Sequence, residues 1–105
     1  MSEPLDSPEL YKVSYSELVR GGLRELLQLA ESRGLGPSFL AAAKEIDRLL
    51  HLYPQFGEPL RDLKLDSAQH WIGVVSPLVV RYLLDDEKRL VVVVEPFEAL
   101  PESGL

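Results

Sequence analysis

The sequence has no cysteine among its 105 residues. Without thiols the chain has no disulfide framework, no thiolate zinc site and no cysteine nucleophile. A chain of this length is enough for one ordinary domain, which buries roughly two-thirds of the surface that the unfolded chain exposes. The stability of the fold must therefore come from packing.

Basic residues are also scarce. Eleven lysines and arginines stand against 17 acids, and the formal net charge is -6. A field of this sign opposes the approach of phosphate backbones, so nucleic acid is disfavoured as a partner. No apolar run approaches the ~18 residues of a membrane span, and the N-terminus lacks the basic and apolar regions of a signal peptide. We therefore expect a cytoplasmic protein.

The first half of the chain reads as a short strand and two helices. Residues 1–10 contain two prolines and several acids and predict a flexible tail, whereas residues 11–16 alternate in polarity like a half-buried strand. A helix is expected from an N-cap at Ser16 to a stop at Gly34. A second helix is expected to start at Pro37, with an apolar stripe composed of Phe39, Ala43, Ile46, Leu50 and Tyr53.

The second half carries three runs rich in β-branched residues, which read as strands: HWIGVV, LVVRYLL and RLVVVV. Ser76-Pro77 and the charged run DDEKR separate them, and the acidic residues Asp85, Asp86 and Glu87 are expected to lie in a solvated hairpin turn. The stretch FGEPLRDLKLD is expected to be a connection, and residues 97–105 an irregular tail. The order β-α-α-β-β-β predicts an α+β domain over residues 11–96, with a helical hairpin packed on one face of a small antiparallel sheet.

Two segments carry a resemblance to a known family. AAKEIDRLLHLYPQFGEPLRDL and HWIGVVSPLVVRYLLDDEKRLVVVV, together with the element order, resemble the RelE/ParE toxin superfamily. The resemblance covers roughly residues 11–96 and is strongest from Ala41 onward. It implies a toxin of a toxin–antitoxin pair, with an antitoxin as partner. RelE-like members cleave messenger RNA on the ribosome, and ParE-like members inhibit DNA gyrase.

The residues depart from the nuclease pattern of that family. The positions where the RelE-like nucleases carry cations correspond here to Ile72, Val74 and Val79, and the final segment offers Glu95, Pro96, Phe97 and Glu98. Cleavage by a ribose hydroxyl builds negative charge on phosphorus, and preorganised cations must stabilise it. These residues cannot, so the sequence predicts a protein without nuclease activity.

The last two strands are apolar on both alternating faces, although one helical hairpin can cover only one face. The sequence therefore predicts either an apolar patch that binds a partner or a tail that folds back over the sheet with Phe97 and Leu100. The candidate partner-binding residues are Arg61, Lys64, Trp71, Val79, Arg81 and Leu83. The alternative for the basic ones is pairing with Asp62 and Asp66 in a solvated loop, with Arg81 covering the sheet.

No cofactor and no small-molecule substrate are predicted. A metal site is not predicted either, because His51 and His70 lack a repeated ligand spacing. Three readings stay open. The first is a RelE/ParE-like protein that acts by contact with an antitoxin, a target or a second copy of itself. The second is a divergent ribonuclease with cations from Arg61, Lys64, Arg81 and Arg89. The third is a remnant that keeps the fold without toxicity.

Overall fold

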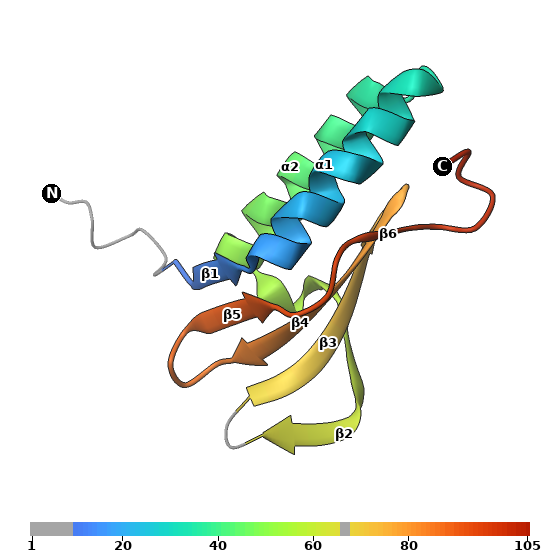
Figure 1. Cartoon of the computed structure of the whole chain (residues 1–105). Coiled ribbons are helices and arrows are strands. Elements are labelled where there is room, and N and C mark those ends of the chain that lie inside the picture. Colours follow the sequence, from blue (N-terminus) through green and yellow to red (C-terminus); the bar gives the residue numbers. More distant parts are fainter. Residues whose placement is uncertain (1–9, 66–67) are drawn as a thin grey trace, which may run out of the picture.

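A computed structural model describes residues 10–65 and 68–105, and for residues 61–65 it describes the backbone alone. The predicted tail of residues 1–10 thus lies outside the described residues, except for Leu10. The chain forms two helices packed against a six-stranded sheet, as shown in Figure 1. This confirms the α+β class and the helical hairpin on one face of the sheet.

The helices begin and end at the predicted signals. After strand β1 (Lys12–Tyr15), the hydroxyl of Ser16 accepts the N–H of Val19 and caps α1 (Glu17–Ser32). Gly34 follows with a φ of 74°, the left-handed conformation in which glycine is favoured. Helix α2 (Gly36–Leu52) has proline in its first turn.

The end of α2 departs from the predicted apolar stripe. Tyr53 has φ -152° and ψ 71°, because Pro54 disfavours helical angles in the residue before it. Its side chain turns away from the core and is 57% exposed, so the prediction that Tyr53 extends the apolar stripe was wrong. A single 3₁₀ turn, η2 (Pro54–Phe56), follows.

The sheet has the order β1-β5-β4-β3-β2, with β6 beside β4. Its further strands are β2 (Glu58–Leu65), β3 (Ala68–Val75), β4 (Leu78–Asp85), β5 (Leu90–Val93) and β6 (Glu98–Ala99). Strand β1 runs parallel to β5, and the other pairs are antiparallel.

The predicted connection after α2 is a strand over most of its length. Strand β2 pairs with β3 through Glu58 opposite Ile72 and Pro59 opposite Trp71, with an irregularity before Lys64. Gly57 and Pro59 in this stretch predicted a loop. An edge strand tolerates proline, because a proline there need not donate to a second neighbour. The predicted irregular tail likewise contains β6.

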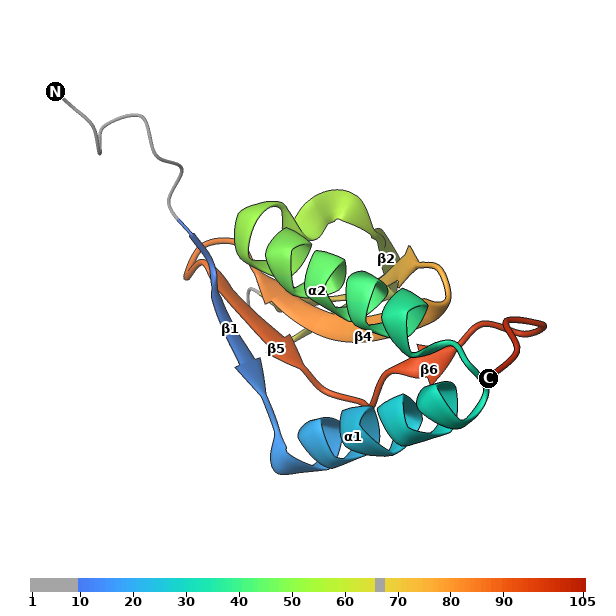
Figure 2. The ribbon, with the colours of Figure 1, turned by 90° about the horizontal axis from the view of Figure 1, so that it is seen from above.

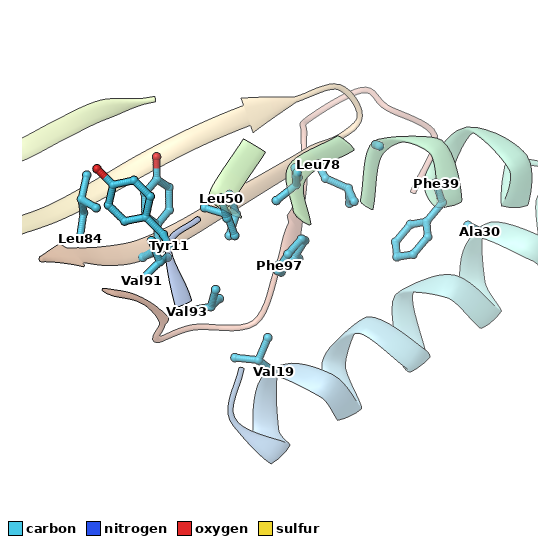
Figure 3. Packing of buried hydrophobic residues seen from close by; sticks show 14 residues of the cluster. Tyr11, Val19, Ala30, Phe39, Leu50, Leu78, Leu84, Val91, Val93 and Phe97 are labelled. Carbon is cyan, nitrogen blue, oxygen red and sulfur yellow. The ribbon is translucent and has the colours of Figure 1, made fainter. Parts of the chain in front are cut away.

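The core lies between the sheet and the helices, which cover one face (Figure 2). Along β4 the alternate side chains that face the helices are buried, namely Leu78, Val80, Tyr82 and Leu84. Phe97 joins them with 5% exposure and points into the space between β4 and the helices (Figure 3). The C-terminal segment is therefore part of the core.

The crossing from α2 to the sheet is held by Tyr82. Its hydroxyl donates to the carbonyl of Pro54 over 2.6 Å, and its ring stacks on Phe56 with centroids 6.0 Å apart. Burial raises the pKa of Tyr82, so the phenol stays protonated and keeps donating. A Cβ on Gly57 would lie 2.2 Å from the carbonyl oxygen of Ile72, which leaves room only for glycine.

We expect Gly57→Ala to destabilise the protein by about 1–3 kcal/mol or more, because backbone must move to admit the methyl group. The control is Gly21→Ala in α1, whose Cβ would meet nothing within 4 Å. It should stabilise the protein by about 1 kcal/mol through helix propensity. Urea unfolding followed by circular dichroism measures both, and equal effects of the two substitutions would refute the packing assigned to Gly57.

Candidate partner-binding face

The side of the sheet away from the helices carries a mostly apolar surface. Alternation along β4 turns Val79, Arg81 and Leu83 away from the core. The register with β3 places Val74 opposite Val79, Ile72 opposite Arg81 and His70 opposite Leu83. We call this surface the open face, and it consists of His70, Ile72, Val74, Val79, Arg81 and Leu83. Val74 is its most exposed large apolar residue, at 52%.

Arg81 is the only lysine or arginine in β3 and β4, both of which lie within the described residues. Its guanidinium forms ion pairs with Glu98 at 2.8 Å and with Glu95 at 3.8 Å. The pairing of Val79 with Glu98 in β6 brings that carboxylate alongside. The hydrogen bond with Glu98 raises the pKa of Arg81 further. The charge of this arginine is thus already compensated by two carboxylates of the same chain.

A second polar cluster lies at the other end of β4. Arg89 stacks on the ring of Tyr11 at 4.2 Å from its centroid, and the hydroxyl of Tyr11 donates to Asp86 and accepts from Gln55. Tyr11 itself is buried with the core residues on the helix side (Figure 3). Burial, and then the hydrogen bond to Asp86, raise the pKa of Tyr11. This cluster ties the start of β1 to the hairpin.

The hairpin itself differs in part from the predicted solvated turn. Asp86 and Glu87 are exposed as expected, but Asp85 is only 7% exposed and its carboxylate accepts the N–H of Lys88. The carboxylate closes the turn, where Arg89 adopts a φ of 52°.

The structure brings together some of the predicted site residues. Val79, Arg81 and Leu83 share the open face, whereas Trp71 lies opposite Tyr82 and faces the helices. The indole nitrogen of Trp71 is shielded from solvent and has no hydrogen-bond partner among the described residues. The side chains of Arg61 and Lys64 lie outside the described part of the structure. Arg89 stacks on a core residue of the helix side and does not join Arg81.

The sequence-based list omitted half of the open face. His70, Ile72 and Val74 belong to it, since each lies opposite a residue of β4 that points the same way. Period-two alternation along HWIGVV held this signal, but only the register with β4 shows which set faces outward.

Phe97, one of the two residues considered as a cover for the open face, lies on the other side of the sheet. Phe97 is buried on the helix side, and the N–H of Leu100 donates to the carbonyl of Pro77. Further on, Arg33 of α1 donates to the carbonyl of Gly104, so the chain end turns towards the helices. The alternative in which the tail covers the open face therefore does not hold for Phe97.

Within residues 10–65 and 68–105, no group of three or more histidine, aspartate or glutamate side chains is arranged to hold a metal ion. His51 instead places its Nδ1 2.8 Å from the carbonyl oxygen of Asp47, one turn earlier in α2. No helix of the described part has the length and apolar character needed to span a membrane.

No protein-family model and no curated protein matches this chain. A solved structure does: the toxin–antitoxin complex RelBE2 from Mycobacterium tuberculosis, with a TM-score of 0.58 and 24% sequence identity. The match covers 90% of this chain and 95% of that chain. The chain has a RelE-like fold. The resemblance seen in the sequence is thereby confirmed at the level of the fold, and the open face is one side of the sheet of this RelE-like fold.

The pair of Arg81 and Glu98 should couple weakly, because both side chains are partly exposed. A double-mutant cycle with Arg81→Gln and Glu98→Gln should give a coupling free energy of about 0.2–1 kcal/mol. It should fall in 1 M salt, where screening acts over about 3 Å. Urea unfolding of the four variants measures the coupling. A coupling free energy of zero at low salt would contradict the position of β6. The control cycle combines Lys44→Gln with Glu98→Gln, two residues for which no contact is expected.

Proposed function

We propose that this protein is a member of the RelE/ParE toxin superfamily that acts by protein–protein contact through its open face and does not cleave RNA. The observation that carries this proposal is the composition of that face. Ile72, Val74, Val79 and Leu83 supply apolar side chains next to one another. An apolar surface rimmed by polar groups is typical of a protein-binding site.

The electrostatics of the open face argue against a nuclease. A phosphate in the transition state needs cations that are free to meet its growing charge. Arg81 is held between Glu95 and Glu98, and those carboxylates would repel a phosphate. The net charge of -6 acts in the same direction over a longer range.

We propose that the open face contacts a protein target in the cytoplasm and that an antitoxin neutralises the protein by covering this face, with a second copy of the chain as the alternative partner. The structurally similar RelBE2 is a complex of a toxin with an antitoxin, which supports a partner of this kind. The surface offered to the partner is mostly apolar, and the arginine in its middle row, opposite Ile72, is already compensated by two carboxylates. A protein segment that brings its own apolar side chains matches this surface better than a nucleic acid does.

Inducible expression in a bacterial host tests the proposal, with growth and transcript integrity as readouts. We expect growth arrest without codon-associated cleavage of messenger RNA. Val74→Glu should relieve the arrest, because an unpaired carboxylate buried in an interface costs about 3 kcal/mol, or roughly a hundredfold in affinity. The control is Leu40→Glu, since Leu40 is 42% exposed and belongs to α2, away from the open face.

Three outcomes would count against the proposal. Ribosome-associated cleavage that disappears in Arg81→Ala would establish a nuclease. Relief of the arrest by Leu40→Glu as well as by Val74→Glu would show that the open face has no special part. Growth unaffected by the wild-type protein would favour a fold that has lost toxicity.

A further inference from the structure

A groove of about 540 Å³ runs along α1, on the side of the molecule that the proposed function does not use. One wall is formed by the face of α1 from Glu17 to Leu29, and the other by Pro96 and Phe97. At 1.5 Å per residue this wall is roughly 18 Å long. The groove is therefore long enough for about three turns of a helix lying beside it.

Two neighbouring glycines, Gly21 and Gly22, line the groove. Packing within the molecule explains why a glycine is needed at Gly22 but not at Gly21. A Cβ on Gly22 would lie 3.0 Å from the Cβ of Pro96, so the close approach of the C-terminal segment requires a small residue. A Cβ on Gly21 would meet nothing within 4 Å. In the interior of a helix glycine costs about 1 kcal/mol relative to alanine. Within the described residues, no contact requires a glycine at Gly21 and so offsets this loss of helix stability.

The chemistry of the groove is apolar with an acidic margin. Leu18, in the wall, is 71% exposed and is the most exposed large apolar residue described. Glu17 and Glu25 also line the groove. The arginines of α1, Arg20 and Arg24, are exposed but do not belong to its lining.

We propose that this groove binds a basic amphipathic helix of a partner protein. The apolar stripe of such a helix enters the hollow at Gly21 and covers Leu18. Lysines or arginines beside the stripe form ion pairs with Glu17 and Glu25. Charge complementarity decides the occupant. A second copy of this chain has a net charge of -6 and would be repelled as a whole.

The probe is a synthetic 14-residue helical peptide built from leucine and lysine, with a glutamate-for-lysine peptide of the same pattern as its counterpart. Fluorescence anisotropy measures the affinity, and backbone NMR maps the binding site. Gly21→Leu fills the hollow, so we expect binding to weaken at least about tenfold. Gly21→Ala keeps most of the space and improves the helix to a similar extent, so its affinity should stay within about twofold of the wild type.

The double variant Glu17→Gln, Glu25→Gln tests the charge requirement. It should lower the affinity for the lysine peptide by about three- to tenfold. The control, Glu87→Gln with Glu102→Gln, changes the net charge equally at exposed positions outside the groove and should have less than about a twofold effect. Val74→Glu, on the open face, should bind the peptide like the wild type. Unchanged peptide binding by this variant would distinguish the groove from the open face on which the proposed function rests.

The inference is overturned if Gly21→Leu binds as tightly as Gly21→Ala, or if the control pair weakens binding as much as the groove pair. Equal affinity for the glutamate peptide also overturns it, as do NMR shifts confined to the open face. Thermal unfolding of each variant confirms that its fold is retained, and Gly21→Leu should not lower the melting temperature.

Discussion

The hydrogen bond from Tyr82 to the carbonyl of Pro54 is the contact on which the rest of the arrangement depends. It joins the exit of α2 to the centre of the sheet, and Gly57 lets the chain pass against the carbonyl of Ile72. Side chains on a strand alternate between its faces. Once Tyr82 faces the helices, Val80 and Leu84 must enter the core and Arg81 and Leu83 must point away.

This constraint separates two surfaces with different chemistry. The open face is apolar, and its arginine is neutralised by Glu95 and Glu98 from the C-terminal segment. The same segment then places Phe97 in the core and Pro96 against Gly22. One short stretch of chain thus compensates the charge on one side of the sheet and forms a wall of the groove on the other. A fold can host unrelated functions, so the RelE-like architecture does not itself imply the nuclease chemistry.

Local signals in the sequence predicted much of the fold. The cap at Ser16, the stop at Gly34 and the strand runs after residue 68 are all present, because each depends on neighbours within a few residues. Strand β2 was missed, since Pro59 and the preceding Gly57 gave this stretch the composition of a loop, although an edge strand tolerates a proline. Of the candidate site, Val79, Arg81 and Leu83 were found together, but Trp71 faces the helices.

The sequence by itself determined the absence of cysteine chemistry, the acidic net charge, the positions of the helix ends and the apolar character of the sheet, because these are properties of composition and short-range geometry. Only the tertiary structure decided which alternating set of β3 faces outward, that Arg81 meets Glu98, and that Gly21 opens a hollow beside α1. Those facts depend on strand register and on contacts between distant segments, which the order of residues in a single strand or helix does not contain.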